Sequence, residues 1–258
     1  MEHESVAANL RESFRVVASH RAMGEVKEMD GVSIASAGVV FQMFNAAFLS
    51  GSVHSEAQMD LRVAEAAVYF AARGQSWAYW ICHGYLDGRT RRRLQPVLRK
   101  RNLYRAVELP GMVAEQVLPP VRKLPRVEMR RVEDGPVKDA FCAIGSTCFN
   151  VPLAWFCEVF DSPTIWRDFE AYVGYVNGEP VSSAATVIGG GVVGVYNVAT
   201  MPAHRRGGYG ETVMRHALER AQQEHGLSRT ILQSTPQGYD LYQRMGYRTV
   251  TSVSVFCS

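Results

Sequence analysis

The stretch that most constrains the fold of this chain is residues 192–221, which combine a strand, a glycine-rich turn and a helix. The run Val192–Tyr196 is apolar and β-rich, which predicts a strand, and Pro202 ends it because proline cannot donate to a strand ladder. Apolar residues near 3.6 spacing over 213–221 predict a helix. Between them lies the run Arg205-Arg206-Gly207-Gly208-Tyr209-Gly210.

A glycine-rich turn at the start of a helix is suited to binding phosphate. The first backbone N–H groups of a helix have no internal partners, and the helix dipole is positive there. Glycines let the backbone close on an anion without Cβ clashes, and Arg205 and Arg206 add positive charge. The alternative is a tight turn with no ligand, but three glycines next to two arginines favour phosphate binding.

The spacing Arg-x-x-Gly-x-Gly, formed by Arg205, Gly208 and Gly210, resembles the acetyl-CoA pyrophosphate loop of the GNAT acyltransferase superfamily. The segment 238–247 is similar to the late helix of that superfamily, where a Leu-Tyr pair precedes Gly-Phe or Gly-Tyr by three residues. The resemblance covers about Pro125 to Ser258. It implies an α/β fold with a mixed (α+β) sheet, and it identifies a reaction class without naming the substrate.

The resemblance implies direct acyl transfer from acetyl-CoA to an amine within a ternary complex. In the superfamily, backbone N–H groups of a splayed central strand polarise the thioester carbonyl, and by position these belong here to Val198, Ala199 and Thr200. Tyr242 matches the tyrosine that protonates the leaving thiolate, whereas Tyr239 and Tyr247 are expected in the core. The residues implied in cofactor binding are Val198, Ala199, Thr200, Arg205, Arg206, Gly207, Gly208, Tyr209, Gly210 and Glu211.

The residues that handle the acceptor amine are less clearly marked. The amine must be neutral to attack, so a general base or a water path is expected. Glu170, on a predicted hairpin strand, is one candidate base, and Glu158 and Asp161 are others. Asn197 is a candidate for orienting substrate or backbone, because asparagine is unfavourable in strands. Neither Cys148 nor Cys257 has a His or Asp partner placed beside it by a motif, so thiol catalysis is set aside.

The first half of the chain resembles a degenerate copy of the second. A shift of 152 residues places Phe44-Asn45-x-Ala47 on Tyr196-Asn197-x-Ala199, and the predicted elements follow in the same order. The same shift places Glu56 where Gly208 stands. A carboxylate there repels a pyrophosphate, so the first half is expected to lack the cofactor loop.

We therefore predict two domains, residues 1–124 as a degenerate GNAT-like half and residues 125–258 as the acetyltransferase. The first is expected to pack against the second and to wall the substrate cleft, because sites often lie between such halves. The alternative is a structural partner that only covers a sheet edge. A fused pair of halves makes a dimer unnecessary, which favours a monomer over a homodimer.

Composition limits the compartment and the partners. The N-terminal residues contain no signal peptide pattern, and no apolar run reaches the length of about 18 residues that spans a membrane. Five cysteines without a CxxC pair predict reduced thiols in the cytoplasm, and the histidines show no metal spacing. The basic stretch 89–101 is expected to be a solvated helix face, with an acidic substrate or the cofactor 3′-phosphate as alternative ligands. The small net charge of +3 argues against nucleic acid.

The predicted function is N-acetylation of a primary amine on a small molecule or an amino acid, with acetyl-CoA as co-substrate. One alternative is an acyl-CoA-binding regulatory protein without turnover. Tight cofactor binding, with slow thioester cleavage that is insensitive to Tyr242→Phe, would favour it. Another is a peptide or protein N-terminal acetyltransferase, which an open groove between the halves would favour. The sequence does not determine the acceptor, the acyl-chain preference or the oligomeric state.

Overall fold

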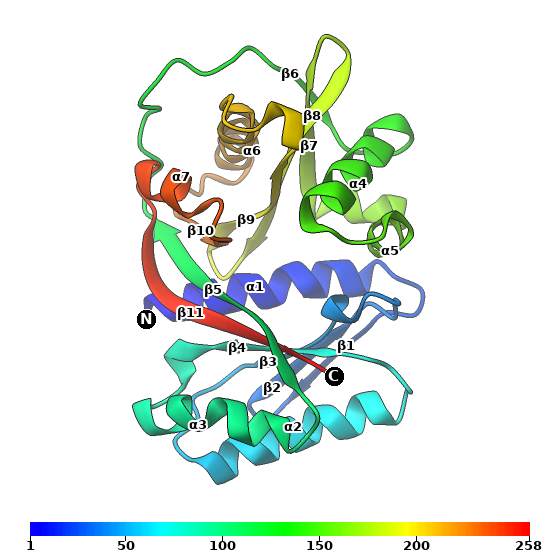
Figure 1. Ribbon diagram of the computed structural model, residues 1–258, viewed down its shortest axis with the longest axis vertical. Coiled ribbons are helices and arrows are strands. Elements are labelled where there is room, and N and C mark those ends of the chain that lie inside the picture. The colour runs from blue at the N-terminus through cyan, green and yellow to red at the C-terminus, as the bar shows by residue number, and fades with distance from the viewer.

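One sheet of eleven strands runs through the whole molecule, of which a computed structural model describes residues 1–258 (Figure 1). The strand order is β1-β2-β3-β4-β11-β5-β10-β9-β8-β7-β6. The β3–β4 and β9–β10 pairs are parallel and the others antiparallel, so the predicted α/β fold with a mixed sheet is confirmed. The strands are β1 (Glu25–Met29), β2 (Val32–Ser36), β3 (Asn45–Leu49), β4 (Ala78–Cys82), β5 (Tyr104–Ala114), β6 (Glu128–Arg131), β7 (Glu170–Val176), β8 (Glu179–Gly189), β9 (Val192–Thr200), β10 (Thr230–Gln233) and β11 (Arg248–Cys257).

Helices cover both faces of this sheet. In the upper part of Figure 1, α6 lies on one side of β7 and β8, and α4 and α5 lie on the other. None of the helices is both long and apolar enough to cross a membrane. The helices are α1 (Glu2–Ser19), α2 (Glu56–Ala71), α3 (Gly88–Arg99), α4 (Pro136–Phe149), α5 (Leu153–Val159), α6 (Tyr209–His225) and α7 (Tyr239–Arg244), with 3₁₀ turns η1 (Gln42–Phe44), η2 (His83–Tyr85), η3 (Pro163–Arg167) and η4 (Pro202–His204).

The order of elements repeats along the chain as the sequence indicates. With the shift of 152 residues, β2, β3, α2 and β4 fall on β8, β9, α6 and β10. In each half, one helix connects two strands that pair in parallel: α2 connects β3 and β4, and α6 connects β9 and β10. Both halves are therefore built on the same strand–helix–strand unit.

The two halves are joined by exchanged long strands. β5, from the first half, lies between β11 and β10, and β11, from the end of the chain, lies between β4 and β5. β11 pairs with β4 from Val253–Cys82 to Cys257–Ala78. The predicted boundary at residues 124 and 125 thus divides a chain whose sheet is continuous, and the exchange has no signature in the sequence.

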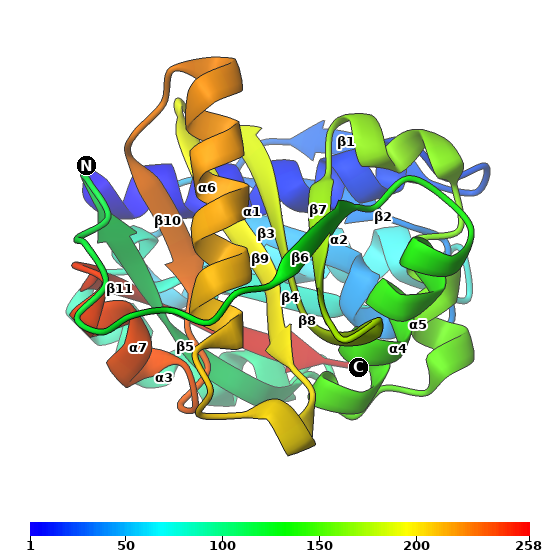
Figure 2. The same cartoon turned by 90° about the horizontal axis from the view of Figure 1, so that it is seen from above.

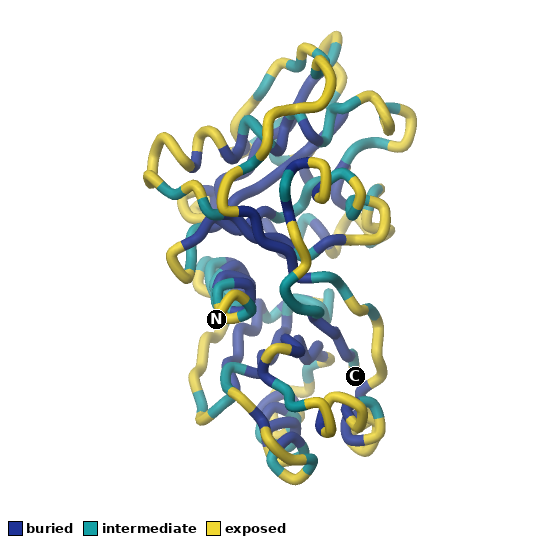
Figure 3. The backbone as a smooth tube through the Cα atoms, turned by 90° about the vertical axis from the view of Figure 1, so that its left-hand side faces the viewer, coloured by how far each residue is buried: buried dark blue, intermediate teal, exposed yellow.

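Helix α1 lies between the upper and lower parts of the molecule (Figure 1). Its predicted apolar face, Val6, Leu10, Phe14 and Val17, is buried. Leu10 and Phe14 belong to a cluster formed with β2, β3, β4 and β11, whereas Val6 belongs to one formed with β5, β9 and β10. The buried residues of Figure 3 follow the strands and the inner side of this helix. Because both halves bury apolar side chains of α1, this helix joins the two halves.

Asn9 fixes α1 to the second half by hydrogen bonds. Its side chain is fully buried, and Nδ2 donates to the carbonyl oxygens of Val187 and Gly189 at 3.0 Å and of Val192 at 3.1 Å. Its Oδ1 accepts a hydrogen bond of 2.6 Å from the hydroxyl of Tyr196. A Cβ on Gly194 would lie 1.8 Å from Asn9 Oδ1, so only glycine allows this contact. The amide therefore positions the β8–β9 hairpin against α1.

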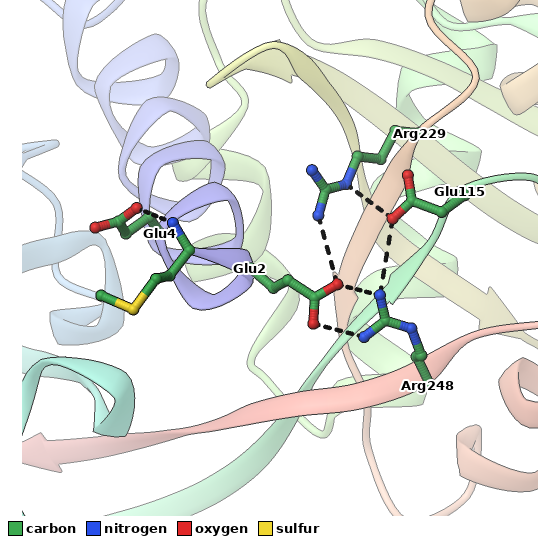
Figure 4. A network of polar contacts seen from close by, with 6 residues as sticks. Glu2, Glu4, Glu115, Arg229 and Arg248 are labelled. Carbon is green, nitrogen blue, oxygen red and sulfur yellow. Dashed lines mark hydrogen bonds and ion pairs between the residues drawn. The ribbon is translucent and has the colours of Figure 1, made fainter.

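A network of charged side chains joins the start of α1 to the strands beside it (Figure 4). Arg248 Nη1 donates to Glu2 Oε2 at 2.7 Å, and Arg229 Nε lies 3.3 Å from Glu115 Oε1. These residues stand at the ends of α1, β5, β10 and β11, where the exchanged strands meet. The side chains are about half exposed, so the network contributes little stability and mainly sets geometry.

We expect Asn9→Ala to lower the free energy of unfolding by about 2–4 kcal/mol, because buried carbonyl groups lose their donor. Urea unfolding followed by circular dichroism measures the change. Ser5→Ala, on the same helix, is the control and should change stability by less than about 0.5 kcal/mol. Equal losses in the two variants would contradict a specific role for the Asn9 amide.

Candidate active site

The central feature of the site is the divergence of β9 from β10. The two strands pair only at Val193 and Gly194, and the rest of β9 has no partner on that side. Asn197 has a φ of 49°, and the β8–β9 register shifts between Ser183 and Ala185, which marks a bulge. The bulge redirects the end of β9 and leaves its outer edge open.

The open edge presents backbone N–H groups. Met201 N donates to Val181 O at 2.9 Å, and donors alternate sides along an antiparallel strand. The amides of Val198 and Thr200 therefore point away from β8 and into the gap. Ala199, the third predicted donor, faces β8, and its carbonyl accepts from Ser182 Oγ at 2.6 Å. Two of the three predicted donors are thus available to a ligand.

The N-terminus of α6 lies beside this gap and is uncapped. Gly208 is its N-cap with a φ of 90°, and no side chain accepts from the first turn. A Cβ on Gly210 would lie 2.9 Å from Thr200 Oγ1, so this glycine lets the helix approach β9 closely. The free N–H groups of the first turn are therefore open to an anion.

The corresponding place in the first half is closed. β3 and β4 stay paired from Ala46 to Phe48, and Val53 N donates to Tyr85 O at 2.8 Å across the position of the gap. Ser55 caps α2 by accepting from Gln58 N at 3.1 Å. The first turn of α2 is thus capped by a side chain, whereas that of α6 is not.

A cavity of about 800 Å³ contains the open edge of β9 and the start of α6. Its lining includes most of the predicted site residues: Val198, Ala199, Thr200, Arg205, Arg206, Gly208, Tyr209, Gly210, Glu211 and Tyr242. Gly207, Asn197 and Glu170 are not part of the lining. Gly207 supports the loop instead, because a Cβ there would lie 2.6 Å from the ring of Tyr209.

Four arginines give the cavity its positive charge. Arg122, Arg205, Arg206 and Arg244 line it, and none forms an ion pair with a carboxylate of the chain. Arg122 Nη2 also donates to Arg206 O at 3.3 Å. The sequence analysis missed Arg122 and Arg244. Arg244 lies within the 238–247 motif, which was the available signal, whereas Arg122 reaches the cavity only because of the path of the connector.

The connector between β5 and β6 crosses the N-terminal end of α6 (Figure 2). Glu211 is buried and accepts from Arg215 Nε at 2.9 Å, and Arg215 Nη1 donates to Leu118 O at 2.7 Å. A Cβ on Gly208 would lie 3.2 Å from Pro125 Cδ. Glu211, although it lines the cavity, therefore holds α6 and the connector together through Arg215.

Tyr242 lines the cavity, as does Tyr209 at the start of α6. The side chain of Tyr242 is 8% exposed, and its hydroxyl makes no hydrogen bond within the protein. Burial raises the pKa of Tyr242 to about 12, so the phenol is protonated at neutral pH and can donate. Gly238 packs against the ring, where a Cβ would lie 2.6 Å from Cε2. Tyr247 is buried and accepts from Thr230 Oγ1 at 2.7 Å, as expected of a core residue.

The candidate bases lie outside the cavity. Glu170 is buried on β7, where Oε1 accepts from the Tyr172 hydroxyl at 2.6 Å and lies 3.6 Å from Arg131 Nε. It belongs to a separate cavity of about 400 Å³ at the other end of α6. Glu158 Oε2 accepts from Val40 N at 3.1 Å, and neither it nor Asp161 lines the main cavity.

Cys148 is a further lining residue that the motifs did not indicate. It lies near the end of α4, and its Sγ donates to Thr200 O at 3.3 Å. Burial raises the pKa of the Cys148 thiol, so the neutral thiol is favoured over a nucleophilic thiolate. The arrangement agrees with a mechanism that does not use a cysteine nucleophile.

One cavity therefore combines an uncapped helix N-terminus, four arginines and the open edge of β9. Residues 140–247 match the acetyltransferase (GNAT) family, so the chain contains an acetyltransferase domain of that family. No curated protein matches the chain in sequence.

Solved structures support the same fold across the whole chain. A GCN5-related N-acetyltransferase from Kribbella flavida is 19% identical with a TM-score of 0.72, over 98% of this chain and 95% of that one. A proposed GNAT-family acetyltransferase from Novosphingobium aromaticivorans is 13% identical with a TM-score of 0.60, over 98% and 97%. A tandem GNAT protein from the clavulanic acid biosynthesis pathway is 10% identical with a TM-score of 0.53, over 88% and 78%. The family resemblance is confirmed, and the similarity extends to tandem GNAT proteins.

We expect Arg244→Ala and Arg122→Ala each to weaken acetyl-CoA binding about tenfold, because each removes a charged donor from the cavity lining. The loss should shrink at high ionic strength. Calorimetric titration with acetyl-CoA measures it, and Arg99→Ala on the exposed face of α3 is the charge-matched control. Unchanged affinity in both cavity variants would show that their side chains do not reach the phosphates.

Proposed function

We propose that this protein transfers the acetyl group of acetyl-CoA to a primary amine of a small molecule, by direct attack in a ternary complex. The observation that carries the proposal is the union of an open β9 edge and an uncapped α6 N-terminus in one cavity. These two features serve opposite ends of the same co-substrate, a thioester and a pyrophosphate.

In the proposed complex the pyrophosphate binds the first N–H groups of α6, next to Arg205 and Arg206. The remaining arginines, Arg122 and Arg244, are available for the outer phosphates. The thioester carbonyl accepts from the amides of Val198 and Thr200. These donors are already oriented, so they stabilise the oxyanion of the tetrahedral intermediate without reorganisation.

The neutral amine attacks the thioester carbon, and the carbon–sulfur bond breaks as the intermediate collapses. The departing thiolate takes the proton of the Tyr242 hydroxyl. The nitrogen of the former amine, which became positively charged on attack, loses a proton to solvent, and solvent returns a proton to the phenolate. Because the pKa of Tyr242 is raised to about 12, this donor stays protonated across the pH range in which an amine becomes neutral.

One acetyl-CoA per chain is expected, since the first half has a capped α2 and no gap between β3 and β4. The first half instead packs α1 and the loop before η1 against the second, and the proposed wall of the acceptor site is this loop, which contacts α5 through Phe41–Trp155 and Val40–Glu158. The complete sheet within one chain favours a monomer. The five unpaired cysteines fit a reducing compartment such as the cytoplasm.

Gly208→Glu should abolish measurable acetyl-CoA binding, because it adds negative charge and a side chain where the pyrophosphate binds. Gly226→Glu is the matched control. It lies at the other end of the same helix, has a similar left-handed φ of 69°, and faces open space. Calorimetry should give one site per chain for the wild type and the control. Binding that survives in Gly208→Glu would refute the proposed site.

Tyr242→Phe should lower kcat for acetyl transfer by about 10²-fold, with the KM for acetyl-CoA nearly unchanged, because the thiolate loses its proton donor. Tyr239→Phe, on the same helix, should have little effect. Release of CoA thiol measures both. Turnover that is insensitive to Tyr242→Phe, together with tight binding, would favour a regulatory acyl-CoA-binding protein.

A further inference from the structure

Exposed apolar side chains gather on α4, α5 and the loop before η1, next to the part of the active-site cavity that Phe149 lines. We call Val40, Phe41, Phe149, Leu153 and Trp155 the aromatic rim. Of the twelve large hydrophobic residues that are exposed in the chain, four belong to this rim, with exposed fractions from 39% for Phe149 to 61% for Val40. Single exposed apolar residues are common on protein surfaces, whereas a cluster of them indicates a binding surface.

The rim adjoins the cavity at Phe149, the one rim residue in the cavity lining, and it spans both halves. Phe149 lines the cavity and stacks on Phe156 with centroids 6.3 Å apart. On the next helix, the ring of Trp155 lies 6.4 Å from that of Phe41, which belongs to the first half. The rim thus begins beside the Cys148–Thr200 contact, at the thioester end of the cavity, and ends on the loop before η1.

The charged groups at the rim are already paired. Glu158 Oε2 accepts from Val40 N, and its Oε1 lies 3.9 Å from Arg21 Nη2. Arg21 also donates to the backbone carbonyl of Glu158. The carboxylate that contacts the rim therefore has little capacity to bind a second ammonium group of a ligand.

We propose that the acceptor is an amine carried on an apolar, ring-sized group, of the arylalkylamine class, and that the aromatic rim binds this group. The inference rests on the proposed function. A flat apolar body packs against the rings of Phe149 and Trp155, while its amine points to the thioester.

The rim also addresses the missing general base. None of the three candidate carboxylates lines the cavity, and of the two carboxylates that do, Glu211 is paired with Arg215 and Asp240 lies on α7. An ammonium group moved into apolar surroundings loses solvation, which lowers its pKa and favours the neutral nucleophile. Desolvation by the rim thus supplies part of what a positioned base does in other enzymes.

The test compares acetyl transfer to 2-phenylethylamine, spermidine and glucosamine by CoA thiol release. For the wild type, kcat/KM should be highest for 2-phenylethylamine. Trp155→Ala should lower kcat/KM for that acceptor about tenfold while the KM for acetyl-CoA stays unchanged, because ring contacts and apolar burial are lost. Trp155→Phe should retain most of the activity.

The control is Val68→Ala, which removes an exposed apolar side chain from α2, far from the rim in the chain's fold. Trp155 is 40% exposed, so its variants should keep wild-type acetyl-CoA binding, which also reports correct folding. Transfer to spermidine or glucosamine alone would overturn this inference and leave the proposed function intact. Acetyl-CoA binding without transfer to any amine would overturn the proposed function, and this inference with it.

Discussion

The structure depends on how β9 is held at the point where it leaves β10. Gly194 is the last residue of β9 that pairs with β10, and Asn9 Oδ1 occupies the space of its missing Cβ. Two residues later, the Tyr196 hydroxyl donates to the same oxygen. A helix at the start of the chain thus anchors the strand directly before its bulge at Asn197. Without that anchor, the edge of β9 would have no fixed direction, and its donors would not be preorganised.

The two halves show how one strand–helix–strand unit gives a ligand site in one context and a closed support in the other. In the second half, Gly208 leaves the α6 N-terminus open, whereas Ser55 and Gln58 cap α2 in the first. In the first half, a bridge between Val53 and Leu86 closes the position that corresponds to the open gap beside β9. The first half contributes structure to the second: α1, β5 and part of the aromatic rim.

Electrostatics and desolvation divide the cavity between them. The end near α6 holds four unpaired arginines and the positive end of a helix dipole, which suits phosphates. The other end carries Phe149 and the neutral thiol of Cys148, which suits an uncharged nucleophile and an acyl group. Tyr242 lies in the lining between these functions with an unused hydroxyl. In the proposed reaction, the positively charged end of the cavity would hold the anionic co-substrate, and the apolar end would hold the neutral amine.

Local sequence determined the elements whose signals are short-range. Apolar periodicity marked α1, glycines and arginines marked the α6 N-terminus, and the shift of 152 residues marked the repeated unit. The site residues from Val198 to Glu211 and Tyr242 followed from motifs in the same way, and most line one cavity. Only the tertiary structure decided the exchange of β5 and β11, the entry of Arg122, and the distance of Glu170 from the cavity. The strand exchange depends on pairing between residues more than a hundred positions apart, which propensity and spacing do not encode, because strand partners are selected by the packing of the whole core.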